Sequence, residues 1–157
     1  MKLVAALAIL CGWTYSVSAD GKCGRGWVQY RDSCYFISER QKFTWFDAWN
    51  ACWILQGYPV EISSKNEQKF LGEKMGDGAY HTGGNEVLGR LIWHTGLRRF
   101  GYKSLDWRGS DKKKFRNRKC VAAMRIRGKM RLIKKRCHSL EKIICERPVN
   151  LFKWYSP

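Results

Sequence analysis

The clearest chemistry in this sequence is the binding of anions by a basic segment, residues 112–136. The segment contains thirteen Lys and Arg residues and no Asp or Glu. Arginine side chains pair with sulfate, phosphate and carboxylate through two parallel hydrogen bonds, and lysine supplies a point charge. Many basic segments are simply solvated surface, but the lack of acidic neighbours here favours ligand binding. The candidate residues are Lys112, Lys113, Lys114, Arg116, Arg118, Lys119, Arg125, Arg127, Lys129, Arg131, Lys134, Lys135 and Arg136.

Positive charge is confined to one half of the chain. Residues 20–97 hold nine basic and nine acidic residues, whereas residues 98–147 hold nineteen basic and four acidic residues, a net charge of +15. Charges that served solubility would be scattered, because self-repulsion is smallest when like charges lie far apart. The segregation therefore predicts a polyanionic partner, such as a sulfated glycan, an acidic matrix protein or an anionic cell surface.

Sequence motifs for catalysis or metal binding are missing. No Gly-x-Ser-x-Gly, His-Glu-x-x-His or phosphate-cradling glycine loop occurs. His81, His94 and His138 have no carboxylate or nucleophile partner evident in the sequence, so we interpret them as surface or structural residues. The lack of a Cys-x2-Cys pair argues against structural zinc. We expect neither enzymatic activity nor a cofactor.

Residues 1–19 are typical of a secretory signal peptide. Lys2 precedes an apolar run, residues 3–11, and the small residues Val17-Ser18-Ala19 predict cleavage before Asp20. The apolar run is shorter than the roughly 20 residues that span a bilayer, which disfavours a membrane anchor. We expect a secreted, extracellular protein with no transmembrane segment, and this destination argues against a nucleic-acid partner.

Six cysteines follow this peptide, an even number in a chain bound for an oxidising compartment. We therefore expect three disulfides, although counting does not select among the possible pairings. The cysteines are Cys23, Cys34, Cys52, Cys120, Cys137 and Cys145.

Local patterns predict two helices in the first half of the domain. The first follows the N-cap Thr44, because buried-face spacing runs from Trp45 to Cys52. The second follows Ser64, because Glu67 three residues on completes a capping box.

Strands predominate in the second half. From residue 121 to 132 apolar and basic residues alternate around Gly128, which predicts a hairpin with one apolar face and one basic face. The apolar set is Met124, Ile126, Met130 and Leu132, and the basic set is Arg125, Arg127, Lys129 and Arg131. The pattern predicts one α+β domain over residues 20–148, followed by a short aromatic tail, residues 149–157.

The order of these motifs resembles that of long-form C-type lectin-like domains, and the chain looks similar to the perlucin-like group of molluscan secreted lectins. The matching stretches are Cys23 to Tyr35, Trp45 to Cys52, Ile62 to Leu71, Cys120-Val121, Cys137 and Ile144-Cys145-Glu146. The resemblance implies two helices packed on small antiparallel sheets. It also implies three disulfides, which are Cys23–Cys34, Cys52–Cys145 and Cys120–Cys137.

The segments that bind calcium and select sugars in that family are altered here. The segment that carries the family's Glu-Pro-Asn or Gln-Pro-Asp motif is missing here, because Cys120 follows Arg118 after a single residue. Leu132-Ile133-Lys134 occupies the place of its Trp-Asn-Asp triplet. Calcium takes about six to eight oxygen ligands, so we expect the primary calcium site to be lost.

These observations predict a secreted, calcium-independent binding module whose basic face takes anionic ligands. Two alternatives remain open, an innate-immune or antimicrobial lectin that binds microbial surface carbohydrate, and a structural shell or extracellular-matrix protein. Trp107 lies among the basic loops and is open to two interpretations, stacking on a sugar or covering an apolar edge.

Overall fold

The computed structural model describes residues 22–99, 105–109 and 119–150. The predicted signal peptide, the candidate cations Lys112, Lys113, Lys114, Arg116 and Arg118, and residues 151–157 of the tail lie outside this part. The elements are β1 (Val28–Tyr30), β2 (Ser33–Ile37), α1 (Trp45–Ile54), β3 (Tyr58–Pro59), α2 (Lys65–Lys74), β4 (Ala79–Val87), β5 (Arg90–Trp93), β6 (Arg98–Arg99), β7 (Cys120–Ile126), β8 (Lys129–Lys135) and β9 (Lys142–Pro148). No described helix is long and apolar enough to cross a membrane.

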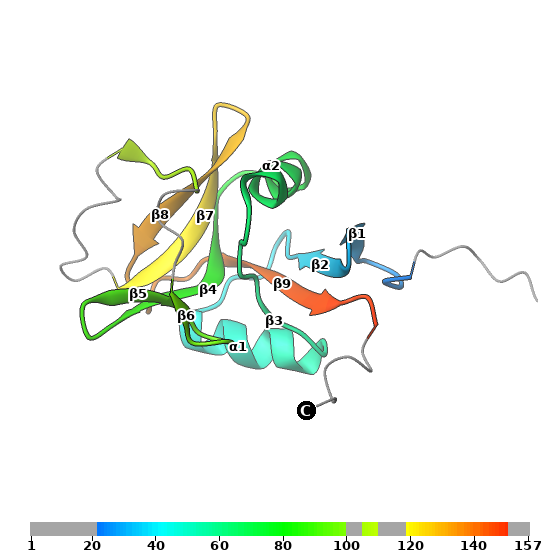
Figure 1. Ribbon diagram of the computed structural model, residues 1–157, viewed down its shortest axis with the longest axis horizontal. Helices are drawn as coiled ribbons and strands as arrows, with labels where there is room; N and C mark the ends of the chain where they lie inside the picture. Colours follow the sequence, from blue (N-terminus) through cyan, green and yellow to red (C-terminus); the bar gives the residue numbers. More distant parts are fainter. Residues whose placement is uncertain (1–21, 100–104, 110–118, 151–157) are drawn as a thin grey trace, which may run out of the picture.

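The strands form two antiparallel groups joined at β4 and β9. In one group β2 pairs with β1 and β9, and β3 also pairs with β9. In the other, β4 pairs with β5 and β7, β5 with β6, and β7 with β8. The junction is a parallel pairing of Tyr80 with Lys142 and of His81 with Ile143, a departure from the purely antiparallel sheets expected. The predicted α+β architecture is confirmed (Figure 1).

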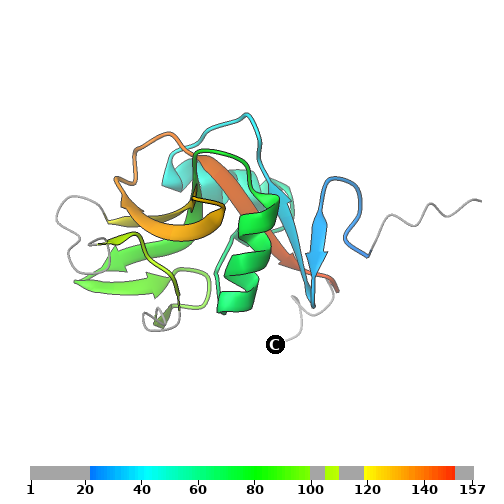
Figure 2. The same cartoon turned by 90° about the horizontal axis from the view of Figure 1, so that it is seen from above.

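The two predicted helices lie on opposite sides of β9 (Figures 1 and 2). Each begins where its cap predicts, because Thr44 Oγ1 accepts a hydrogen bond from Asp47 N and Ser64 Oγ accepts one from Glu67 N. Helix α1 packs Ala48 and the Cys52–Cys145 disulfide against β9. Helix α2 packs against the main core and against β8.

Close contact between α2 and the hairpin depends on Gly72. A Cβ atom at this position would lie 2.9 Å from both the Cβ and the backbone nitrogen of Met130. A larger side chain would therefore push α2 away from β8.

All three disulfides implied by the resemblance are confirmed. Cys23–Cys34 fastens the start of the domain to β2, Cys52–Cys145 joins α1 to β9, and Cys120–Cys137 joins the start of β7 to the segment after β8. The hairpin β7–β8 is thus closed by a covalent bond at one end and by its turn at the other.

Candidate functional site

The hairpin β7–β8 and its flanks carry the candidate cations that the structure describes. These residues are Lys119, Arg125, Arg127, Lys129, Arg131, Lys134, Lys135 and Arg136. The turn residues Arg127 and Gly128 have φ angles of 49° and 74°, the geometry of a two-residue type I′ turn. The predicted hairpin is confirmed.

The expected division of this hairpin into one apolar and one basic face is wrong. Residues directly opposite each other in an antiparallel pair point to the same face, and here Arg125 is opposite Met130 while Met124 is opposite Arg131. A two-residue turn sets odd-numbered positions of β7 opposite even-numbered positions of β8. The apolar residues are even-numbered on both strands, so they lie on opposite faces, and the cations are divided in the same way.

Three of the cations are buried or form an ion pair with an acidic side chain of the domain. Lys134 is buried, with 3% of its surface exposed, so its expected place on an exposed basic surface is wrong. Arg131 Nη1 lies 3.1 Å from Asp106 Oδ2, and Lys135 Nζ lies 2.6 Å from Glu141 Oε1. Both acids come from other segments of the chain, so the basic segment itself gave no sign of these ion pairs.

The other five cations are exposed and lie at the two ends of the hairpin. Arg125, Arg127 and Lys129 surround the turn and form the tip group. Lys119 and Arg136 each precede a cysteine of the Cys120–Cys137 bond and form the disulfide-end pair. Within the part of the chain that the structure describes, no acidic side chain forms an ion pair with any of the five.

A cleft of about 550 Å³ separates the turn of the hairpin from α2. Lys65 and Lys69, one helical turn apart on α2, line this tip cleft together with Lys129. Glu73 and Asp106 line it as well, so the cleft carries both signs of charge. Sequence reasoning missed the two α2 lysines because they belong to the neutral half, although their spacing on a predicted helix was visible.

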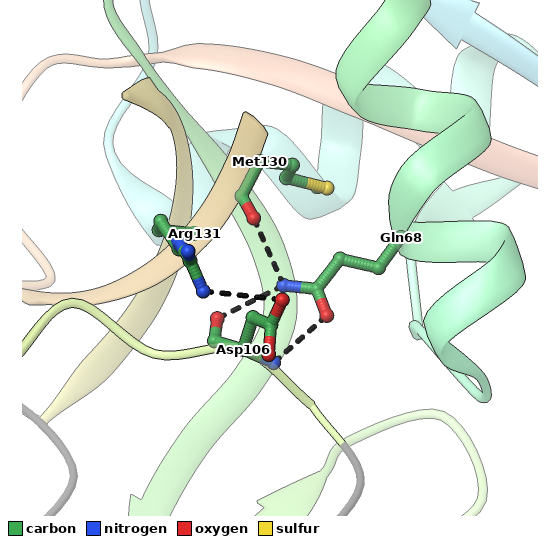
Figure 3. Close-up of polar contacts among 4 residues, drawn as sticks. All are labelled: Gln68, Asp106, Met130 and Arg131. Carbon is green, nitrogen blue, oxygen red and sulfur yellow. Dashed lines mark hydrogen bonds and ion pairs between the residues drawn. The ribbon is translucent and has the colours of Figure 1, made fainter. Parts of the chain in front are cut away.

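One buried side chain, Gln68 of α2, fixes the wall of the tip cleft (Figure 3). Its Nε2 donates hydrogen bonds to the carbonyl oxygens of Asp106 (2.9 Å) and Met130 (3.2 Å). Its Oε1 accepts a hydrogen bond from the Asp106 backbone nitrogen (2.9 Å). Together with the Arg131–Asp106 ion pair, these bonds hold residues 105–109 and β8 to the helix.

The disulfide end has a cleft of its own, of about 570 Å³. Its lining residues are Phe46, Lys119, Arg136, Cys137, His138 and Ser139. The Phe46 side chain, on the first turn of α1, is 53% exposed. Its ring contacts Trp45 edge-on and His138 at a tilt, with centroid distances of 5.5 Å in both cases. Trp45 N donates to the Cys137 carbonyl (2.8 Å), which ties α1 to this end of the hairpin.

The residues in place of the family's Trp-Asn-Asp triplet are all buried. Leu132 is fully buried, and Ile133, like Lys134, is 3% exposed. Trp107 is 9% exposed and packs in the main core beside Leu132, so it covers an apolar edge rather than stacking on a sugar. Among the described residues, no group of three or more His, Cys, Asp or Glu is placed to hold a metal ion.

Two buried carboxylates, those of Glu67 and Glu146, meet between α2 and β9, a contact that the sequence did not indicate. Tyr35 donates a hydrogen bond to Glu67 Oε1 (3.0 Å), and Ser33 donates one to Glu146 Oε1 (2.9 Å). Burial, reinforced by the charge of Glu67, raises the pKa of Glu146 to about 7. Burial also raises the pKa of Tyr35, with further contributions from the two carboxylates.

The three histidines occupy different environments. His81 is buried, its Nε2 lies 2.9 Å from the Ser139 carbonyl oxygen, and burial lowers its pKa. His94 is exposed and contacts the rings of Trp45 and Trp49. His138 lines the disulfide-end cleft, so it is the histidine placed near a candidate ligand.

Known structures share this fold. The C-type lectin domain of murine dendritic cell inhibitory receptor 2, solved in complex with an N-glycan, matches 80% of this chain and 98% of its own, with a TM-score of 0.74 and 18% identity. A calcium-independent type II antifreeze protein matches 80% of this chain and 94% of its own, with a TM-score of 0.69 and 20% identity. The chain therefore has the C-type lectin-like fold that its motifs resemble.

Sequence relatives agree with this assignment. A perlucin-like protein from Mytilus galloprovincialis is 36% identical over 63 residues, covering 36% of this chain and 40% of that protein. The matched segments span less than half the length of this and other curated relatives, among them a human C-type lectin domain protein that is 29% identical over 82 residues, covering 52% of this chain and 26% of that protein. No protein-family model matches the sequence. The chain thus has the C-type lectin-like fold and is similar in part of its sequence to proteins of the C-type lectin family.

Proposed function

We propose that this chain is a secreted, calcium-independent binding module of the C-type lectin-like fold, and that its basic hairpin binds polyanions, sulfated glycans in particular. The carrying observation is the set of five exposed cations without described acidic partners at the two ends of one hairpin, of which Lys129 lines the tip cleft and Lys119 and Arg136 line the disulfide-end cleft. Exposed charges act together within a Debye length, about 8 Å at physiological salt, so such clusters favour multiply charged ligands. An acidic matrix protein or an anionic microbial surface would satisfy the same charges.

Binding rather than catalysis fits the relatives, whose names are those of lectins and receptors. Secretion is supported by the three disulfides, which persist in oxidising compartments, and by the predicted signal peptide. Calcium independence is supported by the apolar and basic side chains that replace the family's Trp-Asn-Asp triplet. The antifreeze protein of the same fold is described as calcium-independent, so the fold itself does not require the ion.

The polyanion proposal is tested by heparin affinity measured over a range of salt concentrations. Binding should weaken steeply as salt rises, because released counterions drive the association of a cationic face with a polyanion. Replacing Lys119, Arg125, Arg127, Lys129 and Arg136 with Gln should abolish most of the binding. The matched control removes five exposed cations from the neutral half, which are Lys22, Arg25, Arg40, Lys42 and Arg90. Equal losses in both variants would overturn the proposal.

Calcium independence is tested by thermal melting. A ligand that binds the native state raises the melting temperature by mass action, so the melting temperature should be the same in excess calcium and in chelator. Heparin affinity should also be unchanged by chelation. A rise in melting temperature with calcium that chelator reverses would contradict this part of the proposal.

A further inference from the structure

The cleft at the disulfide end of the hairpin combines an exposed aromatic ring with two cations. We propose that this cleft is a subsite for one anionic sugar residue, whose ring packs on Phe46 while its sulfate or carboxylate lies between Lys119 and Arg136. This inference rests on the proposed function and adds to it a specific residue, a specific pose and a contribution that is not electrostatic.

The position of the two cations supports an anion between them. Cys120 is opposite Lys135 at the end of the hairpin, and Lys119 and Arg136, the residues that follow this pair outward on each strand, both line the disulfide-end cleft. Two like charges that line one cleft repel each other, and an anion bound between them removes that repulsion. Glu141, an acid from the next segment, is already paired with Lys135 at 2.6 Å.

The position of Phe46 supports a ring-shaped partner. Its ring is 53% exposed in a cleft that has no carboxylate among its described lining residues. Contacts with Trp45 and His138 fix the ring, so little side-chain freedom is lost when a ligand packs on it. The apolar face of a sugar ring buries area on such a platform, and a cleft of about 570 Å³ is within the range of small-molecule sites.

The subsite differs from the tip cleft in a way that sets its ligand. Lysines at the tip share their cleft with Glu73 and Asp106, which repel an added anion. The described lining residues of the disulfide-end cleft supply cations and aromatic surface and include no carboxylate. A single sulfated or carboxylated sugar therefore fits the disulfide end better than the tip.

A heparin tetrasaccharide, titrated by calorimetry against matched variants, tests the proposal. Phe46→Ala should weaken binding about tenfold and leave the salt dependence unchanged, because it removes a contact but no charge. Phe46→Leu should recover part of the loss. Trp53→Ala is the control, because Trp53 is 71% exposed on the same helix but does not line the cleft.

A second experiment tests the contribution of the two cations. It compares the double variant Lys119→Gln, Arg136→Gln with the double variant Arg125→Gln, Arg127→Gln, which removes the same charge from the tip. The first pair should weaken tetrasaccharide binding more and lower the salt slope by about two, since two ion contacts are lost. Melting curves confirm folding of each variant.

The two levels of proposal fail in different ways. A parent protein that does not bind heparin fragments at low salt would overturn the proposed function. A parent that binds, with Phe46→Ala equal to Trp53→Ala and the two charge pairs equal to each other, would overturn the subsite and leave polyanion binding standing.

Discussion

At the disulfide end of hairpin β7–β8, two cations share a cleft with an aromatic ring, whereas at the tip three lysines share a cleft with two carboxylates. The two strands are the same, and both ends of the hairpin carry exposed cations. The difference lies in what packs against each end, α1 at one and α2 at the other. It teaches that the neighbouring elements, and not the charge of the segment alone, decide what surrounds the cations at each end.

The ends are also held differently, one by a covalent bond and the other by the hydrogen bonds of Gln68. Replacing Cys120 and Cys137 with Ala should lower the free energy of unfolding by about 3 kcal/mol, since the bond closes a loop with a sequence separation of 17. Urea denaturation measures this loss, and anion binding at the disulfide-end cleft should weaken with it.

The bond between Cys23 and Cys34 provides a control for this prediction. Its removal opens a loop of similar size, with a sequence separation of 11, but neither residue is among the described residues that line the tip cleft or the disulfide-end cleft. That variant should lose stability and keep its ligand affinity. Equal affinity in the two disulfide variants would mean that the Cys120–Cys137 bond does not shape the cleft.

A second prediction concerns the buried carboxyl group of Glu146, whose pKa is raised in part by the charge of Glu67 on α2. The carboxyl group of Glu146, close to Glu67, has a folded pKa of about 7, above its ordinary value of 4.5. The folded state therefore binds more protons between these values, and stability should fall as pH rises from about 4.5 to 7, by on the order of 3 kcal/mol.

Burial of His81 acts in the opposite direction, because a lowered pKa makes stability fall as pH drops below the ordinary histidine value. The comparison with Glu146→Gln isolates the carboxyl contribution, since that variant keeps His81. Unfolding free energies at a series of pH values should differ in slope between parent and variant across pH 4.5 to 7. Parallel curves would show that Glu146 titrates normally.

The smallest of the three effects concerns the tip. Gln68→Ala leaves the carbonyl groups of Asp106 and Met130 and the Asp106 backbone nitrogen without this buried partner, so it should cost about 2 kcal/mol. The control is Lys69→Ala, an exposed neighbour on the same helix, which should change stability by less than about 0.5 kcal/mol. Because an amide does not titrate, the Gln68 variant should keep the pH profile of the parent. A change in that profile would couple the tip to the buried carboxylates.

Much of the fold was predictable because its signals are local or ordered along the chain. Thr44 and Ser64 cap the two helices as expected, since capping depends on residues within one turn. The disulfide pairing followed from the order of cysteines in a resembling family, not from their number. The hairpin turn was visible from Gly128, which adopts a left-handed conformation that suits glycine.

The candidate site was predictable in charge but not in arrangement. Alternation along one strand states which residues share a face of that strand, and the pairing of two strands is needed to combine their faces. Because the turn has two residues, even-numbered positions of the two strands point to opposite faces of the hairpin. Arg125 therefore shares a face with Met130. Where both faces of a strand pack on other elements, alternation also fails to identify the exposed side, as the buried Lys134 shows.

By itself, the sequence determined the class of the domain, its disulfide framework and the concentration of positive charge in its second half, because these depend on residue types and their order. The tertiary structure decided which cations are exposed and what surrounds them. Phe46 reaches the disulfide end from a helix some seventy positions or more away in the chain, and Gln68 reaches the tip from another. Such meetings depend on how helices and strands pack, and packing depends on contacts between residues that are distant in sequence.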